Sequence, residues 1–529
     1  HLYYEKIAKE PQYLSKIYKN YKSTLLELGR FKEAEKLCKT QIKSFPNKLS
    51  LLVDLAVLFE FNQKQDKKKQ IFDKAINQIQ ENSSYQSVSE LGVAFERVGE
   101  TQKALQAYLK YESVSSRNLL AFHSKIALIY NRQGNTSKMI DTFFEMLLVK
   151  DRFINSVQNG LVNSIDFESQ IKEKEILRKS IIQQIQKNPK KLVFVELLAW
   201  FYMLNNDYEN AFIQIKSLDK KLNQNGAEIL ELGKTALNNE SFNIALKSFN
   251  YIIEQSSSIE NILEAKNLRL LTLKTKLLSG SAIELLELEE LKSSYLLTLN
   301  QLNTTKNIYN NILRKYNLLV DLSEIEAYFL KDIKSAKEHL HKAMSLPSLK
   351  ARLKANAKLK LADILVYEDN IWEASLMYKQ IEKEFKSDAI GHQAKFKNAQ
   401  VYYFSGEYDW CQAQLEVLKA STSKLIANDA LELSVLITDN YNMDTSETPM
   451  KLFSYADMLS KQQQYDAASK LYDSILNNFQ NHSLNDEIIF RKAKISLKKH
   501  KYHEAVNQLI ELVKNYPSSI LLDNSLFLI

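Results

Sequence analysis

The chain has 529 residues, of which 45% are hydrophobic and 25% are charged. This composition is that of a globular protein and excludes wholesale disorder and collagen-like or coil-only architectures. The formal net charge is +8, from 71 Lys and Arg against 63 Asp and Glu, and the basic residues are spread along the whole chain. Because nucleic-acid-binding proteins concentrate basic residues on one face or arm, we expect no nucleic-acid partner.

Glycine and proline are scarce. The chain has 10 Gly and 6 Pro, against roughly 37 and 26 for average composition at this length. A sheet protein rich in tight turns is therefore excluded, and long helices joined by short turns are predicted. No two glycines lie closer than seven residues, which excludes the clustered-glycine loops that cradle phosphates. The longest nearly apolar run, Leu192 to Leu204, is shorter than the roughly 18 residues that cross a bilayer.

A short sequence motif, which we call the repeat word, recurs along the chain. An aromatic or other residue lies two positions after its start, and a small residue lies three positions after that. Its first copy is Gly29-x-Phe31-x-x-Ala34, and its last is Lys499-x-x-Tyr502-x-x-Ala505, with the aromatic one position late. The anchors at the small-residue position are Ala34, Lys68, Ala104, Met139, Ala211, Ala245, Ala336, Ala374, Cys411, Ala468 and Ala505. Within each run, neighbouring anchors are 34 to 38 residues apart, which predicts a helical-repeat protein.

The spacing of the anchors divides the chain into six segments. In order they are N-terminal repeats (1–150), a degenerate hairpin followed by two repeats (151–258), atypical long helices (259–319), repeats with an extra helix near Leu425 to Ile437 (320–437), a polar linker (438–449), and C-terminal repeats of which the last is incomplete (450–529).

This pattern resembles the tetratricopeptide repeat family, whose unit is two antiparallel helices in 34 residues. The family has a small residue at position 8, an aromatic at 17, alanine at 20 and proline at 32. Gly92 and Gly233 match position 8, and Pro46, Pro189 and Pro517 match position 32. The resemblance implies an all-α, right-handed superhelical solenoid of helix hairpins. Small side chains at positions 8 and 20 let the two helices of a unit approach closely, and the units are stabilised by stacking.

The C-terminal words around Tyr465, Tyr502 and Tyr516-Pro517 look like the bacterial envelope subgroup of these repeats, which includes outer-membrane assembly lipoproteins of the BamD type and periplasmic tol-pal coordinators. The stretch from Leu361 to Asn440 looks similar to large uncharacterised repeat proteins of Bacteroidota. These resemblances imply an exported scaffold, in the periplasm or at the outer membrane, that binds proteins of an envelope complex; the alternative is a cytoplasmic protein. The chain begins with His1, and we expect that a preceding segment, such as a signal or lipoprotein peptide, has been removed.

The candidate reactive residues do not indicate a catalytic site. His339 and His341 are two apart on a helix and therefore point about 200° apart, so we interpret them as surface residues. His500 and His503 straddle a predicted turn, where a solvated basic turn is favoured over a metal or anion site. Cys411 occupies a small-residue position and is interpreted as a buried hydrophobe rather than a nucleophile. We expect no cofactor, no metal and no small-molecule substrate.

The resemblance places positions 2, 5, 9 and 12 of each first helix in a concave groove, and some of these residues could instead belong to the core between repeats. The candidate groove residues are Asn356, Asp363, Gln393, Phe396, Gln400, Tyr403, Trp200, Met203 and Lys494, with Leu359, Val366, Phe490 and Leu497 on the same faces. Aromatic, amide and charged groups suit an extended peptide or a partner helix. The Lys, Asn and Arg clamp of chaperone-binding members is not evident.

The sequence therefore predicts a non-catalytic scaffold that binds partner proteins or peptides in its groove. One alternative is an enzyme or ligand-binding protein with a site in segment 259–319, which a buried polar cavity with perturbed acids would favour and an apolar helix interface would not. The other is a cytosolic regulator that binds signalling peptides. The apolar end, Ile520 to Ile529, is unlike the polar outer face of a terminal solenoid helix, so we expect the chain to continue or a partner to cover it.

Overall fold

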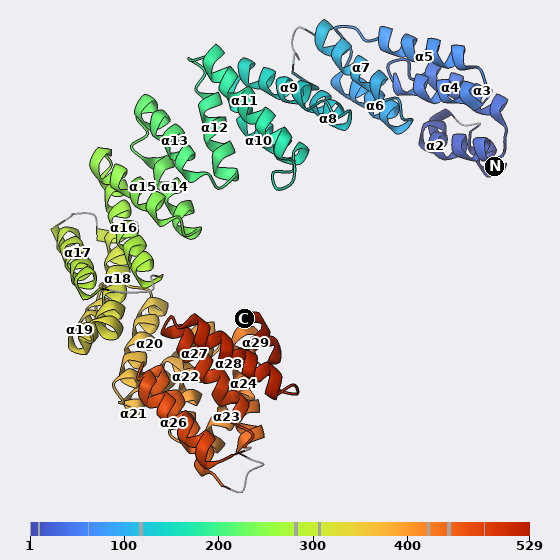
Figure 1. The fold of residues 1–529 in the computed structure, drawn as a ribbon. Helices are drawn as coiled ribbons and strands as arrows, with labels where there is room; N and C mark the ends of the chain where they lie inside the picture. Colours follow the sequence, from blue (N-terminus) through green and yellow to red (C-terminus); the bar gives the residue numbers. More distant parts are fainter. Residues whose placement is uncertain are drawn as a thin grey trace. The chain divides into compact units, whose positions relative to one another are not determined.

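The computed structural model describes residues 2–8, 11–61, 63–115, 120–279, 284–304, 308–420, 424–441, 446–480 and 482–529. Within these ranges every regular element is a helix and there is no strand (Figure 1). Most helices in the described ranges pack against the helix that follows them in the chain. The all-α helical-repeat class that the sequence predicts is therefore confirmed. The chain forms two compact units, His1–Ala236 and Leu237–Ile529, which are described separately.

Unit 1 contains the helices drawn in blue to green in Figure 1. They are α1 (Leu2–Ile7), α2 (Pro11–Glu27), α3 (Phe31–Ser44), α4 (Ser50–Phe61), α5 (Gln65–Asn77), α6 (Tyr85–Arg97), α7 (Thr101–Val114), α8 (His123–Arg132), α9 (Thr136–Val149), the short 3-10 helix η1 (Asp151–Phe153), α10 (Ile154–Ser164), α11 (Ile171–Lys187), α12 (Val193–Leu204), α13 (Tyr208–Leu222) and α14 (Ala227–Asn238), whose last residues cross into unit 2.

Unit 2 contains the remaining helices. They are α15 (Phe242–Gln255), α16 (Ile259–Ser279), α17 (Leu285–Thr304), α18 (Ile308–Glu324), the π-helical turn η2 (Ile325–Phe329), α19 (Ile333–Met344), α20 (Ala351–Tyr367), α21 (Ile371–Glu384), α22 (Ala389–Phe404), α23 (Tyr408–Lys419), α24 (Lys424–Asn440), α25 (Thr448–Lys461), α26 (Tyr465–Asn478), α27 (Asn485–Lys498), α28 (Tyr502–Asn515) and α29 (Leu522–Leu528).

Every anchor follows the same turn. The residue five positions before each anchor has a φ between +56° and +79°, the left-handed conformation that ends a helix and reverses the chain. These residues are Gly29, Gln63, Gly99, Gly134, Asn206, Glu240, Lys331, Asp369, Gly406, Gln463 and His500. In the third turn the Glu100 N–H donates to the Phe95 carbonyl at 2.9 Å, as in a Schellman motif. The last word therefore begins at His500 and not at Lys499, and Tyr502 is in its ordinary place.

Small residues meet where the two helices of a hairpin cross. The anchors other than Lys68 are fully buried. Twelve residues earlier, nine of the eleven units have Ala or Gly, namely Ala56, Gly92, Ala127, Ala199, Gly233, Ala362, Ala399, Ala456 and Ala493. An ideal Cβ at Gly92 would lie 2.2 Å from the Tyr108 ring, so a larger side chain does not fit between α6 and α7. The exceptions at this position are Lys22 and Glu324.

The segments that lack the repeat word are also helical. The long helices expected in 259–319 are α16 and α17, with 21 and 20 residues, and the expected extra helix is α24. Residues 442–445 of the proposed linker 438–449 lie outside the described residues, and the six segment boundaries stay a prediction. In α29, Leu526 and Phe527 are exposed at 58% and 89%. No helix in the described part of the chain is long and apolar enough to cross a membrane.

Candidate functional site

Two adjoining hollows in unit 2, with volumes of about 520 and 900 Å³, form one continuous groove. They share Phe396 and Gln400 of α22, Asp429 of α24 and Lys461 of α25. The remaining lining residues come from α20, α22, α24, α25 and α27, from the Lys350 that precedes α20 and from Tyr465 at the start of α26. We call this surface the α24 groove.

Helix α24 forms one wall of this groove because it is inserted between two helix hairpins and is not itself part of a repeat hairpin. Helix α22 packs directly against α25, while α24 packs mainly against α23. Gln412 of α23 fastens α24 with three hydrogen bonds: its amide donates to the Ser434 carbonyl at 2.9 Å and to Thr438 Oγ1 at 3.1 Å, and its Oε1 accepts from Ser434 Oγ at 2.6 Å. The inserted helix therefore stands beside the α22 and α25 surface.

Apolar side chains line part of the groove, and most of them are partly or fully buried. Phe396 lies at the junction of the two hollows, and Leu433 and Leu436 of α24 line the smaller one. Leu425, near the start of α24, lines the larger hollow and is 78% exposed. Apolar groups at a concave surface supply most of the affinity of protein recognition sites.

A buried polar centre supports the floor of the groove. Asp457 of α25 accepts hydrogen bonds from Tyr403 Oη at 2.9 Å, from Tyr472 Oη and from Arg491 Nε at 3.2 Å. Burial raises the pKa of Glu487 to about 7, although the nearby Arg491 guanidinium opposes this rise. The oxygens of Asp457 are thus already engaged, so this centre joins α22, α25, α26 and α27 and does not present Asp457 to a ligand.

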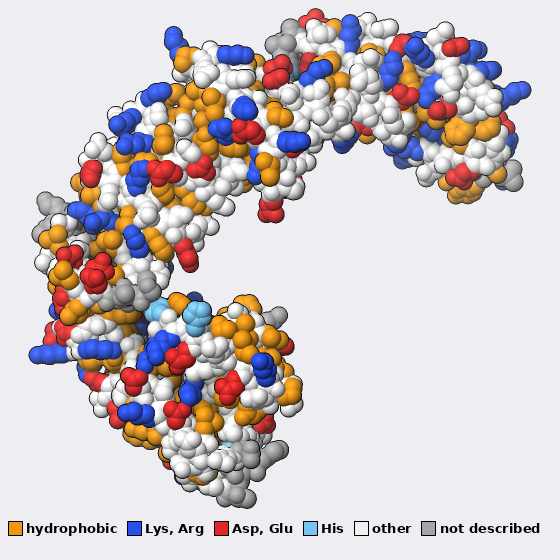
Figure 2. Space-filling view, in the orientation of Figure 1, with side chains coloured by type: hydrophobic (Ala, Val, Ile, Leu, Met, Phe, Trp, Pro, Cys, Tyr) orange, Lys and Arg blue, Asp and Glu red, His pale blue; other side chains and the backbone are white. Residues whose placement is uncertain are grey.

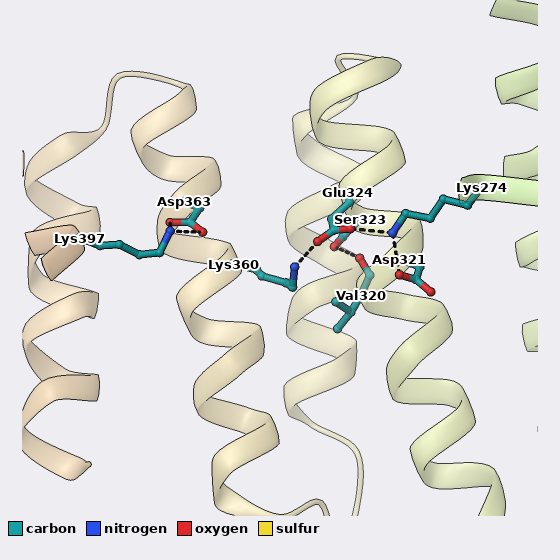
Figure 3. Close-up of polar contacts among 8 residues, drawn as sticks. All are labelled: Lys274, Val320, Asp321, Ser323, Glu324, Lys360, Asp363 and Lys397. Carbon is teal, nitrogen blue, oxygen red and sulfur yellow. Dashed lines mark hydrogen bonds and ion pairs between the residues drawn. The ribbon is translucent and has the colours of Figure 1, made fainter. Parts of the chain in front are cut away.

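Ion pairs connect alternate helices of unit 2, from α16 through α18 and α20 to α22 (Figure 3). Lys274 of α16 lies 2.7 Å from Asp321 and 2.6 Å from Glu324 of α18. Lys360 of α20 also pairs with Glu324, and Lys397 of α22 lies 2.8 Å from Asp363 of α20. We call this set (Lys274, Asp321, Glu324, Lys360, Asp363 and Lys397) the ion-pair ladder. Within it, each Lys has a carboxylate partner.

The two ladder carboxylates of α18 respond differently to their surroundings. Burial raises the pKa of Asp321, and Lys274 offsets only part of this rise. Burial also acts on Glu324, but there the charges of Lys274 and Lys360 outweigh it, so the pKa of Glu324 is lowered. Because these carboxylates are paired with lysines, they hold helices together rather than serve as a free acid and base.

Lys461 is the next cation along this surface and lacks a carboxylate. Its ammonium donates to the Gln400 side-chain carbonyl at 3.0 Å, and no carboxylate of the described residues lies within ion-pair distance of it. The Lys461 side chain as a whole is exposed, while its ammonium is partly buried among protein atoms of the groove. This burial, with repulsion from Lys397, lowers the pKa of Lys461 to about 8.

The wall formed by α24 carries unpaired acids. Asp429 and Glu432 both line the groove, and neither has an ion-pair partner in the described part of the chain. Burial and the charge of Glu432 raise the pKa of Asp429. On α27, Lys494 lies over the Phe490 ring at 4.4 Å, and burial lowers its pKa. The groove therefore has an acidic wall on α24 facing a surface whose unpaired charges are basic.

Most of the predicted groove residues meet at this surface. Asn356, Gln393, Phe396, Gln400 and Lys494 line the groove. Tyr403 borders it but is only 2% exposed and belongs to the core. Asp363 holds Lys397, which lines it. Trp200 and Met203 belong to α12 of unit 1, where Trp200 packs edge-to-face against Phe167 with ring centroids 6.0 Å apart. That any of these residues binds a partner stays a prediction.

Three residues assigned to the same faces belong to the core. Leu359, Val366 and Phe490 are at most 3% exposed, because the helices of neighbouring hairpins cover those positions. Conversely, Asp457, Lys461, Arg491 and the α24 residues escaped the sequence analysis. Position 9 of the α25 unit is Asp457, so the same rule applied there would have found it. No repeat word marks α24, and the sequence alone does not indicate that its side chains form a wall of the groove.

The histidine and cysteine expectations have mixed outcomes. His339 is partly buried rather than fully exposed: its Nδ1 lies 2.7 Å from the fully buried Glu326 of η2, which packs against α19. His341 is exposed as expected. Cys411 is fully buried, and burial raises the pKa of its thiol to about 12, which confirms a packing role. No three His, Cys, Asp or Glu side chains of the described residues are grouped to hold a metal ion.

The atypical segment has an apolar helix interface. Leu263 and Leu270 of α16 pack with Leu288, Leu291 and Tyr295 of α17. A hollow of about 480 Å³ lies between these two helices and is lined by Leu273, Leu277 and Leu291, by Ser294 and by the charged residues Arg269, Lys276, Glu287 and Glu290. The perturbed acid of the neighbouring helix α18, Asp321, does not line it and is paired with Lys274. This arrangement favours the scaffold interpretation over a catalytic site.

Comparison with known proteins adds little. No protein-family model and no curated protein matches the chain. Among solved structures, a chain from "Structure of Naa15/Naa10 bound to HypK-THB" is 13% identical with a TM-score of 0.28, covering 97% of this chain and 91% of that one. A chain from "Crystal structure of APC/C hetero-tetramer Cut9-Hcn1" is 14% identical with a TM-score of 0.22, covering 96% and 94%. Similarity at this level carries no argument about function.

Proposed function

We propose that this protein is a non-catalytic helical-repeat scaffold of the tetratricopeptide type that binds a partner protein in the α24 groove. The observation that carries the proposal is the combination, on packed helices, of apolar side chains that line a groove with charged side chains that have no ion-pair partner among the described residues. Leu425 and Phe396 supply the apolar surface, and Lys461, Asp429 and Glu432 supply the charges. Peptide segments bind such grooves through apolar anchors, and polar groups determine their register.

Charge distribution favours a protein partner over nucleic acid. On the face shown in Figure 2, basic and acidic side chains are interspersed rather than gathered into a basic patch. Inside the groove, Asp429 and Glu432 would repel a phosphate backbone. A phosphodiester ligand requires a surface that is predominantly basic.

We further propose that the scaffold works in a bacterial envelope, in the periplasm or at the outer membrane. This location is supported by the likeness of the words around Tyr465 and Tyr502 to envelope repeat proteins. Fractionation of cells that produce the full-length natural protein tests it. Recovery with periplasmic or outer-membrane fractions is expected, and recovery in the cytosol would favour a cytosolic regulator instead.

The groove itself is tested with two matched variants. Leu425→Glu places a charge in the groove, and Leu376→Glu makes the same change on α21, where Leu376 is 58% exposed outside the groove. The tagged protein is purified from its own cells, and each co-purifying protein is then tested for direct binding to the three purified chains. We expect at least one partner that binds wild type and Leu376→Glu alike and loses about tenfold or more in affinity with Leu425→Glu. Equal binding to all three chains would exclude the groove as the binding surface.

A further inference from the structure

The ion-pair ladder ends at a cation, Lys461, that has no carboxylate of the described residues within ion-pair distance. Lys274, Lys360 and Lys397 have carboxylates supplied by the neighbouring helix. At Lys461 the corresponding neighbour on α22 is the amide of Gln400, at 3.0 Å. An opposite charge within a few ångströms stabilises an ammonium. An incoming carboxylate could therefore make the ion pair that the fold leaves out.

The opposite wall of the groove, on α24, has the reverse arrangement: its acidic side chains have no cation paired with them in the described part of the chain. Asp429 and Glu432 of α24 point along the same groove without an ion-pair partner in the part of the chain that the structure describes. Two like charges on one helix three residues apart repel each other, so a cation placed between them would relieve the repulsion. A purely acidic ligand gains at Lys461 but loses at this wall, and a purely basic ligand does the reverse.

We propose that the α24 groove recognises a polypeptide segment with charges of both signs, whose carboxylate pairs with Lys461 and whose basic side chain pairs with Asp429 and Glu432. Apolar side chains of the same segment lie on Phe396, Leu425 and Leu433. The inference rests on the proposed function and adds the chemistry of the partner. It also assigns a role to the inserted helix α24, which supplies the acidic side chains that pair with the basic residue of the bound segment.

A phage-displayed library of random peptides, selected on the full chain at neutral pH and physiological salt, tests this charge code. On wild type we expect peptides that combine apolar residues with Asp or Glu at one position and Lys or Arg at another. Lys461→Glu is expected to replace the acidic residue by a basic one. Asp429→Lys combined with Glu432→Lys is expected to replace the basic residue by an acidic one. For one selected peptide, each charge reversal should weaken binding at least tenfold.

Matched controls separate recognition from folding. Lys470 is an exposed lysine of α26 outside the groove, so Lys470→Glu changes the net charge as Lys461→Glu does and should leave the selected peptides unchanged. Lys461→Gln, which removes the charge without reversing it, should lose the preference for an acidic residue and gain no new one. Circular dichroism and the melting temperature of each variant check that the helices remain folded.

The outcomes distinguish this inference from the proposed function. Peptides that bind wild type, fail to bind Leu425→Glu, and show no charge preference or one unaffected by the reversals would overturn the inference and leave the groove as a binding site. Purely acidic or purely basic selected peptides would also overturn it. If no peptide binds wild type more tightly than Leu425→Glu, the groove itself is contradicted. A dimer of wild type that Leu425→Glu dissociates would identify a second copy of the chain as the occupant and overturn the inference.

Discussion

Two glycines of α6 and its following turn are required for different physical reasons. Gly99 has a φ of +78° and no atom within 4 Å of an added Cβ, so it serves the backbone conformation of the turn. Gly92 has ordinary helical geometry, but its added Cβ would lie 2.2 Å from the Tyr108 ring. Gly99 is therefore required by the backbone conformation of the turn, and Gly92 is required by the limited space between α6 and α7.

Alanine substitutions separate these two roles. Gly99→Ala should destabilise unit 1 by about 1 kcal/mol, the cost of a left-handed alanine. Gly92→Ala should cost about 2–3 kcal/mol, because α7 and the Tyr108 ring must move to admit a methyl group. Urea unfolding of both variants measures the difference. A larger loss from Gly99→Ala than from Gly92→Ala would contradict the close approach of α6 and α7.

His123 couples the stability of unit 1 to pH. Its Nδ1 lies 2.9 Å from Glu112 of α7, and its Nε2 lies 3.0 Å from Glu145 of α9. Burial acts to lower the pKa of His123, but the hydrogen bonds and charges of these two carboxylates outweigh it, so the pKa is raised. A histidine whose pKa is higher in the folded state stabilises the protein fully below its unfolded pKa, about 6.5, and this contribution is lost as the pH rises through the folded pKa.

The corresponding test compares wild type with His123→Gln. We expect the wild type to exceed the variant in unfolding free energy by more at pH 6 than at pH 9, because only the imidazolium pairs with Glu112 and Glu145. Urea unfolding of unit 1 at both pH values gives this difference. A constant difference across the range would show that His123 contributes only as a neutral hydrogen-bonding group.

Helix α24 illustrates how a single inserted element adds a wall to the surface of a repeat array. Its hold on α23 depends on the three hydrogen bonds of Gln412 and on Leu436 and Ile437, which are buried in the core of unit 2. Gln412→Leu should remove the polar part of this attachment and leave the Ser434 hydroxyl without one partner, at a cost of about 1–3 kcal/mol.

Amide hydrogen exchange measures that cost locally. We expect faster exchange in α24 of Gln412→Leu, with unchanged exchange in α28, which has no contact with the substituted residue. Affinity for a groove-binding peptide should fall with the same variant, because the acidic wall is then held less firmly. Unchanged protection of α24 would mean that its apolar contacts alone position the wall.

At the scale of the whole molecule, the buried apolar residues form several clusters along the chain rather than one central core. Phe143 of α9 is buried in a core of unit 1, and Phe453 of α25 is buried in a core of unit 2. Repeat arrays are stabilised by nearest-neighbour interfaces, so a local loss of packing does not propagate far along the chain.

A matched pair of truncations tests this independence. Phe143→Ala should destabilise unit 1 by about 3–5 kcal/mol, and Phe453→Ala should do the same to unit 2. Hydrogen exchange under increasing denaturant should show each loss in one unit only. Equal destabilisation of both units by either variant would indicate a single cooperative structure.

The sequence by itself determined the local architecture. The spacing of Ala34, Ala104 and the other anchors located each hairpin turn, since the left-handed residue lies five positions before every anchor. The helical period also placed Gln393, Phe396 and Gln400 on one face of α22. These features depend on residues close together in the chain, where helix geometry relates sequence spacing to direction.

Only the tertiary structure decided what the groove contains. Lys461 meets Gln400 across 61 residues of sequence, and the acids of α24 lie beside them although no repeat word marks that helix. The burial of Leu359 and Phe490 and the pairing of His339 with Glu326 were decided in the same way. Such contacts depend on how hairpins stack and where an inserted helix rests, and a periodic pattern along one helix carries no information about the distance to another.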